Sequence, residues 1–138
     1  MGTTSHLQVK DVMGQAVITL QRNDKLSVAD DLMKQKHIRH IPVLDENGKL
    51  CGIVTQRDLF HGALLKALGY GSHLKQKMLE SLLIKEAMTN EVRTTSPESS
   101  LAEAARVMLD EKIGCLPVVN EDKLVGLLTE ADFLKLAV

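Results

Sequence analysis

Short apolar runs, separated by polar turns, recur along this chain and have the length of β-strands. Ile41–Leu44 and Leu50–Thr55 flank Asn47-Gly48, a dipeptide typical of hairpin turns. Leu116–Val119 and Leu124–Leu128 form a second pair of the same kind. Because these runs are apolar at successive positions, they are typical of strands in a sheet that is covered on both sides.

Apolar residues at helical spacing precede each hairpin. Before the second hairpin, the predicted helical face follows Ser99 or Ser100, either of which suits an N-cap. The members of that face are Leu101, Ala104, Ala105 and Met108. Before the first hairpin, the corresponding face consists of Leu26, Ala29 and Met33, widened by Val28 and Leu32.

Two further elements complete each half of the chain. Short extended pieces, Val17–Leu20 and Val92–Thr94, come before the helices. A second helix is expected to begin at Thr55 and at Thr129, directly after the hairpins. Each half therefore has the order β-α-β-β-α, and the fold class is α/β.

The two halves are copies of one pattern. An offset of 75 residues pairs Met13 with Met88 and Pro42 with Pro117, and after the hairpin turn an offset of 74 pairs Asp58 with Asp132. One residue has been lost at a polar turn, where deletions are tolerated. Since a single copy of about 50–60 residues buries too little surface to be stable alone, we expect two repeats packed about a pseudo-two-fold axis.

The repeat sets the expected domain boundaries. We expect a disordered lead-in over residues 1–8, the first repeat over 9–60, a helical connector over 61–83 and the second repeat over 84–138. Leu74, Met78 and Leu82 recur at helical spacing in the connector. Two interpretations stay open: a linker helix packed on the domain, or a dimerisation or partner helix.

Composition and charge exclude several classes of function. The chain has 44% hydrophobic and 25% charged residues and a net charge of −1, without the basic surplus that nucleic-acid backbones attract. Two Phe, one Tyr and no Trp cannot build a platform for stacked bases. No apolar run is long enough to cross a membrane. Cys51 and Cys115 lie in apolar runs, which suits a reducing, cytoplasmic location.

The sequence offers no metal site or catalytic constellation. His37 and His40 are three residues apart, but Pro42 makes the chain leave the helix there, which disfavours metal ligation. No serine–histidine–aspartate order, phosphate-loop signature or zinc spacing is present. We therefore expect a protein that binds rather than an enzyme.

The repeated motif resembles a tandem cystathionine-β-synthase (CBS) domain pair, or Bateman module. The resemblance is carried by Ile38–Asp45 followed by Gly52–Leu59, and by Ile113–Asn120 followed by Gly126–Phe133. It covers nearly everything from Val9 to Phe133. Its specificity comes from the ordered set appearing twice at fixed spacing.

The resemblance implies two clefts between the repeats that take an adenosyl ligand: AMP, ADP, ATP or S-adenosylmethionine. In cleft one, Thr55 and Asp58 would hold the ribose and Arg39 and His40 would lie near the phosphate. The base edge there would meet Thr89, Asn90, Ile113 and Gly114. Cleft two would use Thr129 and Asp132 for the ribose, and its base would lie among Gly14, Gln15, Ile38 and Arg39.

A structural interpretation of the same residues stays open. A Thr with an acidic residue three positions on also matches a capping box, which would stabilise a helix and bind nothing. If ligands do bind, cleft one should be the better phosphate site, because Gly114 and Cys115 carry no charge where Arg39 and His40 stand. With so few aromatics, the base should lie between aliphatic side chains, namely Ile38, Ile113, Val54 and Leu128.

The function that follows is a stand-alone regulatory module, such as an energy sensor, that signals by conformational or oligomeric change. Partners would be a second copy of the chain and a regulated protein in trans. The expected dimer contacts are the ends of the second helices: Leu59, Phe60, Ala63, Leu64, Ala67, Leu68, Phe133, Leu134, Leu136 and Ala137. The alternatives are a ligand-free structural dimerisation module and the regulatory insert of a larger nucleotide-metabolism enzyme.

Overall fold

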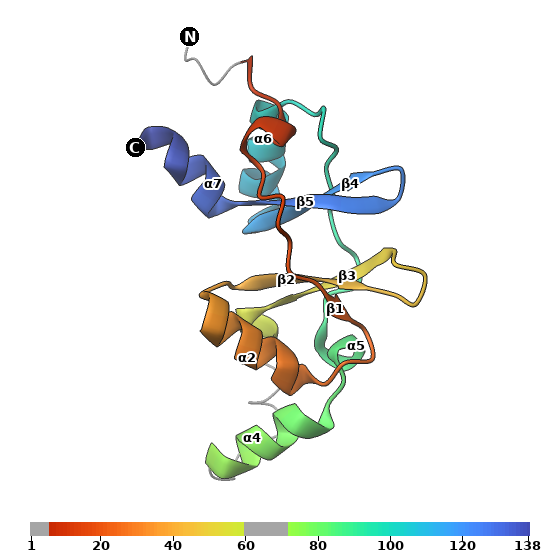
Figure 1. Ribbon diagram of the computed structural model, residues 1–138. Helices are drawn as coiled ribbons and strands as arrows, with labels where there is room; N and C mark the ends of the chain where they lie inside the picture. Colours follow the sequence, from red (N-terminus) through yellow and green to blue (C-terminus); the bar gives the residue numbers. More distant parts are fainter. Residues whose placement is uncertain (1–5, 60–71) are drawn as a thin grey trace. The chain divides into compact units, whose positions relative to one another are not determined.

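The computed structural model describes residues 6–59 and 72–138. The chain forms two compact units (Figure 1). Unit 1 comprises Met1–Val17 and Val92–Val138, and unit 2 comprises Ile18–Glu91. Both contain strands and helices, so the predicted α/β class with two repeats is confirmed.

Unit 2 is built on a sheet of three strands in the order β1-β2-β3. β1 (Leu20–Gln21) is parallel to β2 (His40–Leu44), and β2 is antiparallel to β3 (Leu50–Thr55). Its helices are α2 (Leu26–Lys36), α4 (Ser72–Ser81) and α5 (Ile84–Ala87). Residues 56–59 are also helical, as expected of a helix that begins after Thr55.

Unit 1 contains the hairpin of β4 (Cys115–Asn120) and β5 (Lys123–Thr129). Its helices are α1 (Val9–Val12), α6 (Leu101–Glu111), α7 (Glu130–Leu134) and the 3-10 helix η2 (Lys135–Ala137).

The first strand of the second repeat is reduced to a single bridge between Thr95 and Val118. In the first repeat the corresponding residue is Leu20, which pairs with Val43 and is 4% exposed. Because Thr95 offers less apolar surface than Leu20, it is held less firmly in the core. The extended pieces predicted at Val17–Leu20 and Val92–Thr94 are thus shorter than expected and begin later.

Each unit has its own apolar core, and the predicted helical faces supply much of it. Leu26, Ala29 and Met33 of α2 are buried in unit 2, whereas Leu101, Ala104 and Met108 of α6 are buried in unit 1. Ser100 is the N-cap of α6, and its Oγ accepts a hydrogen bond of 3.0 Å from the Glu103 amide. Val28 does not widen the buried face of α2, because its side chain is 41% exposed.

The described part of the connector packs against unit 2. α4 lies against α2 (Figure 1), and Leu79 and Leu82 are buried in the unit 2 core. The Leu26 amide donates to the Leu82 carbonyl over 2.8 Å, which ties the start of α2 to the end of the connector. These contacts favour the packed linker over the partner helix for this segment. Residues 61–71 of the predicted connector lie outside the described residues.

The opening segment of each repeat packs in the unit that holds the hairpin of the other repeat. α1 belongs to unit 1 and α5 to unit 2. The Leu101 amide donates to the Leu7 carbonyl over 2.9 Å, and Gln8 bridges to Ser100. Leu7 and Gln8, which the sequence assigns to the lead-in, therefore take part in unit 1.

The two hairpins differ at the turn where the second repeat lacks a residue. In β2–β3, Gly48 has φ +77°, and the Asp45 carboxylate accepts from the amides of Asn47 and Lys49. In β4–β5, Glu121 and Asp122 have φ +51° and +66°. Two consecutive residues with positive φ are typical of a type I′ turn, which favours Asn-Gly. Glu121 is not among the residue types that favour this conformation, and Asp122 tolerates it at a cost that Gly would remove.

Replacing the turn residues by Glu121→Asn and Asp122→Gly should therefore stabilise the protein by about 1 kcal/mol, because Asn and Gly accept left-handed backbone at lower cost. Urea unfolding followed by circular dichroism measures the change. Lys123→Gly, at the start of β5 beside this turn, is the control, and it should give no gain since Lys123 has no positive φ. A double variant no more stable than the parent would contradict the expectation.

Candidate functional site

The first candidate site lies where β3 ends and the helix over residues 56–59 begins. The Thr55 amide donates to Asp58 Oδ2 over 2.9 Å, and the Asp58 amide donates to Thr55 Oγ1 over 3.2 Å. This reciprocal pair is a capping box. Both side chains are half-buried, so the carboxylate is held in place while part of it remains accessible.

The second candidate site repeats this geometry in unit 1. The Thr129 amide donates to Asp132 Oδ2 over 2.8 Å, and Thr129 Oγ1 lies 3.3 Å from the same oxygen. Asp132 is 8% exposed and is the buried charged residue of the described core. Its Oδ1 lies 3.9 Å from Lys135 Nζ. The capping interpretation is therefore correct for both motifs, and it is compatible with a ligand on the remaining carboxylate surface.

A second segment runs beside each of these motifs. In unit 2, Ile53 and Thr89 exchange backbone hydrogen bonds of 3.0 and 2.9 Å. In unit 1, Gly14 and Leu127 exchange bonds of 2.9 and 3.0 Å. Thr89, Asn90, Gly14 and Gln15 are exposed. The predicted base-contacting segments are thus bonded to the strand residues two positions before Thr55 and two positions before Thr129.

A glycine makes each of these approaches possible. A Cβ atom on Gly52 would lie 2.9 Å from the Thr89 carbonyl oxygen and 2.5 Å from Met88 Sδ. On Gly126 it would lie 3.0 Å from the Gly14 carbonyl oxygen and 2.5 Å from Met13 Sδ. No other residue type leaves this space open.

The predicted phosphate-contacting residues stand at the same end of the sheet in unit 2. His40 is opposite Thr55 in the β2–β3 ladder, and the Gln56 amide donates to the Arg39 carbonyl over 2.9 Å. Arg39 is exposed and His40 is half-buried. In unit 1 the equivalent bond runs from the Glu130 amide to the Gly114 carbonyl over 3.2 Å, and Cys115 is opposite Thr129.

Two predicted groupings join residues of different units. Ile113 and Gly114 of the cleft-one set belong to unit 1, whereas the rest of that set belongs to unit 2. Ile38 and Arg39 of the cleft-two set belong to unit 2, whereas Thr129, Asp132, Gly14 and Gln15 belong to unit 1. Within unit 2 the structure brings together a set that we call the unit 2 corner: Arg39, His40, Thr55, Asp58, Thr89 and Asn90. Within unit 1 the corresponding set, the unit 1 corner, consists of Gly14, Gln15, Gly114, Cys115, Thr129 and Asp132.

Both cysteines are free thiols. Cys115 is buried, and burial together with the charge of Glu130 raises the pKa of its thiol to about 12. Burial also raises the pKa of the half-buried Cys51. Since the thiolate is the reactive form, neither environment is that of an activated nucleophile.

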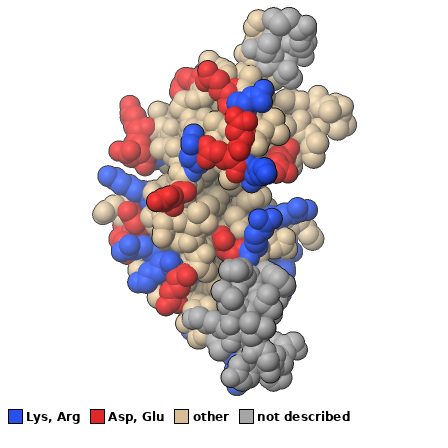
Figure 2. Space-filling model, turned by 180° about the vertical axis from the view of Figure 1, so that it is seen from behind, with Lys and Arg blue, Asp and Glu red and all other residues tan. Residues whose placement is uncertain are grey.

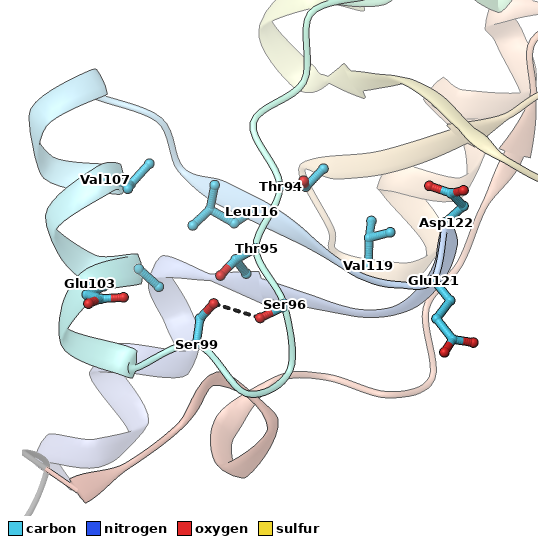
Figure 3. Close-up of a pocket in the computed structure, with 11 residues that line it drawn as sticks. Thr94, Thr95, Ser96, Ser99, Glu103, Val107, Leu116, Val119, Glu121 and Asp122 are labelled. Carbon is cyan, nitrogen blue, oxygen red and sulfur yellow. Dashed lines mark hydrogen bonds between the residues drawn. The ribbon is translucent and has the colours of Figure 1, made fainter.

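A cavity of about 540 Å³, open to the surface, lies on the α6 side of unit 1, and the sequence pattern does not predict it (Figure 3). The Ser96 and Ser99 hydroxyls lie 2.8 Å apart at its edge, and Leu116 and Val107 contribute apolar surface. Thr95 lines it at the position that Leu20 occupies in unit 2, so the repeat alignment contained a signal for it. The cavity does not include Thr129 or Asp132 and is separate from the unit 1 corner.

The surface charges of the described residues are mixed in sign. Acidic and basic side chains are interspersed on the face shown in Figure 2. Within residues 6–59 and 72–138, no group of three or more His, Cys, Asp or Glu side chains is arranged to hold a metal ion. No helix in that part of the chain has the length and apolar character needed to span a membrane.

Comparison with known proteins identifies the family. The model of the CBS domain matches residues 9–64 and 84–138. The chain therefore belongs to the CBS-domain family, as a tandem pair of these domains. The resemblance noted from the sequence is confirmed.

Relatives of different lengths are similar to this chain over most of its length. The chain is 32% identical to the CBS domain-containing protein YhcV of Bacillus subtilis over 90% of its own length and 81% of the relative's. It is 30% identical to the uncharacterized protein MJ1225 of Methanocaldococcus jannaschii but spans 42% of that protein. It is 35% identical to a homoserine O-acetyltransferase of Methanohalophilus mahii and spans 23% of it. The chain thus covers less than half of several relatives.

Solved structures share the fold. A putative acetoin utilization protein, AcuB, from Vibrio cholerae is 40% identical, with a TM-score of 0.77 over 95% of this chain and 90% of that one. The CBS domain pair of protein MJ0100, in complex with 5′-methylthioadenosine and S-adenosyl-L-methionine, is 30% identical, with a TM-score of 0.76 over 95% of each chain. CBSX2 in complex with AMP is 27% identical, with a TM-score of 0.76 over 94% of this chain and 95% of that one.

Gly52→Ala and Gly126→Ala should each destabilise the protein by about 1–3 kcal/mol, because the added methyl group overlaps a backbone carbonyl that is fixed by hydrogen bonds. Urea unfolding measures the loss. Gly14→Ala is the matched control, since its Cβ would lie 3.7 Å from the Leu127 carbonyl oxygen, an ordinary contact. Equal stabilities of the three variants would contradict the close approach.

Cys115 should resist thiol reagents in the folded protein. A pKa of about 12 in place of 9.0 lowers its thiolate fraction about a thousandfold at pH 8. The Cys51→Ser variant isolates Cys115, and absorbance during reaction with a disulfide reagent gives the rate before and after denaturation. Rapid modification of the folded variant would show that the thiol is neither buried nor protonated.

Proposed function

We propose that this chain is a regulatory module that binds an adenosyl ligand, with Asp58 and Asp132 as the ribose-holding residues. The observation that carries the proposal is the duplicated corner: the same Thr–Asp pair, at the same strand end, beside the same exposed backbone segment. Structures of similar proteins in complex with AMP, or with 5′-methylthioadenosine and S-adenosyl-L-methionine, support an adenosyl ligand.

The carboxylates suit a ribose because of how they are held. The capping bonds engage Oδ2 of each Asp and fix the orientation of the group. A carboxylate has about four acceptor positions, so an oxygen engaged in a cap leaves room for the 2′- and 3′-hydroxyls of a ribose. A side chain already ordered by a cap also loses little conformational entropy when the ligand binds.

The base would be read by backbone groups. Thr89 and Asn90 in unit 2, and Gly14 and Gln15 in unit 1, present exposed backbone next to the capped strand ends. The nearby side chains are aliphatic, including the half-buried Ile38 and Ile113. We propose that the adenine ring lies against aliphatic surface in both sites, and that Arg39 and His40 contact a phosphate in the unit 2 corner.

We propose a regulatory rather than a catalytic role. A ligand shifts a conformational or oligomeric equilibrium only when it prefers one of the two states, and a partner must then read the change. We propose a second copy of the chain and a regulated protein in trans as these partners, in the cytoplasm. Leu134 and Leu136, 69% and 40% exposed, offer apolar surface for the dimer contact. The expected contacts at Phe60, Ala63, Leu64, Ala67 and Leu68 lie outside the described residues.

The alternative is a structural dimerisation module whose corners are helix caps and nothing more. The observation in its favour is that both Asp side chains accept a capping bond from the Thr amide at the helix start, and that Thr55 and Asp58 exchange such bonds reciprocally. Ligand binding distinguishes the two functions, because a ligand that binds the native state must raise the melting temperature.

Asp58→Ala and Asp132→Ala should each weaken binding of AMP, ATP, adenosine or S-adenosylmethionine at one corner and also lower stability by about 1 kcal/mol through loss of the cap. Calorimetric titration measures the binding, and urea unfolding measures the stability.

Ser100→Ala is the matched control for these variants. It removes another cap, the bond from the Glu103 amide to Ser100 Oγ, at a similar cost in stability but away from either corner. It should bind ligand like the parent. If the parent binds none of the four ligands and its melting temperature does not move, the adenosyl function is wrong and the structural module is favoured.

A further inference from the structure

The two corners have the same backbone but opposite charge. Bonds from the Gln56 amide to the Arg39 carbonyl (2.9 Å) and from the Glu130 amide to the Gly114 carbonyl (3.2 Å) show that equivalent residues occupy equivalent places. The side chains at these places differ. From unit 2 to unit 1 the pairs are Arg39 and Gly114, His40 and Cys115, Gln56 and Glu130, and Arg57 and Ala131.

In the unit 2 corner, the sequence places two arginines and one carboxylate near the strand end. Arg39 and Arg57 are exposed, one on each side of the backbone bond that joins β2 to the start of the next helix. The negative charge of the motif is the half-buried Asp58. Guanidinium groups in this position provide charge-assisted donors for a phosphate.

In the unit 1 corner, negative charge dominates. Glu130 takes the place of Gln56, and its charge acts on the buried Cys115 thiol, whose pKa it helps to raise. Asp132 is 8% exposed and has Lys135 Nζ at 3.9 Å from Oδ1. Gly114 and Cys115 offer no positive charge where Arg39 and His40 stand. The charges of this corner are therefore the carboxylates of Glu130 and Asp132, offset in part by Lys135, and no guanidinium is present among its residues to contact a phosphate.

We infer that the two corners select different classes of adenosyl ligand: the unit 2 corner takes a phosphorylated nucleoside, and the unit 1 corner takes an adenosyl group that lacks a phosphate and is neutral or cationic. This inference rests on the proposed function, because it assigns ligand classes to those same sites. A thioether nucleoside or a sulfonium ligand fits the unit 1 corner, since Glu130 repels a phosphate and attracts a cation.

The test removes the ribose-binding carboxylate of one corner at a time, so that ligand binding at the other corner can be measured alone. Asp58→Ala leaves the unit 1 corner and Asp132→Ala leaves the unit 2 corner, and each is titrated by calorimetry with AMP, adenosine and S-adenosylmethionine. The Asp132→Ala protein should bind AMP at least about tenfold more tightly than adenosine, as expected for a charge-assisted contact. The Asp58→Ala protein should reverse this order and prefer S-adenosylmethionine and adenosine to AMP.

Charge variants test the cause. In the Asp58→Ala background, Glu130→Gln should weaken S-adenosylmethionine binding several-fold and improve AMP binding, with little effect on adenosine. Glu98→Gln is the matched control, because it removes the same charge from an exposed residue of unit 1 outside the corner. In the Asp132→Ala background, Arg39→Ala should weaken AMP but not adenosine.

The outcomes distinguish this inference from the proposed function. If both single-site proteins bind AMP and adenosine with the same preference, the charge selection is wrong while the adenosyl function stands. If Glu130→Gln changes nothing that Glu98→Gln does not, the selection does not come from Glu130. If the parent binds none of the three ligands, the proposed function fails and this inference fails with it.

Discussion

The exchange of hydrogen bonds between a hairpin strand and the opening segment of the other repeat is the interaction on which the rest of the structure depends. It places Thr89 against Ile53 and Gly14 against Leu127. Both approaches need a residue without a side chain at Gly52 or Gly126. Because α1 and α5 are anchored this way in the unit of the other repeat's hairpin, neither repeat as cut from the sequence would fold into the compact unit seen here.

The same interaction explains how the proposed binding role can coincide with a structural one. The Thr–Asp capping boxes fix the start of a helix at the strand end, and the exchanged segments bring exposed backbone to that end. A site built from a capped carboxylate and hydrogen-bonded backbone is ordered before a ligand arrives. In the proposed sites, specificity comes from side chains that the fold does not need. This explains how the first repeat can have Arg39 and Arg57 where the second has Gly114 and Ala131 while the backbone stays the same.

Local signals in the sequence predicted much of the fold. β3 has the predicted bounds of Leu50–Thr55, and Ser100 caps α6 as one of the two predicted residues. The capping boxes were foreseen because their residues are three positions apart. Hydrophobic spacing could not show which hairpin the Met13 and Met88 segments join, since a segment has the same pattern whichever partner it pairs with. The extended piece of the second repeat is predicted at Val92–Thr94, but its single bridge forms one residue later, at Thr95, where a polar residue takes the place of Leu20.

Native mass spectrometry of the intact chain tests the central claim most directly, because it counts bound ligands and gives their masses. After incubation with equal concentrations of AMP, adenosine and S-adenosylmethionine, the account predicts that each chain carries up to two adenosyl ligands of different classes. Denaturation should release them. A chain that keeps its folded charge-state distribution and carries no ligand at saturating concentration would contradict the account.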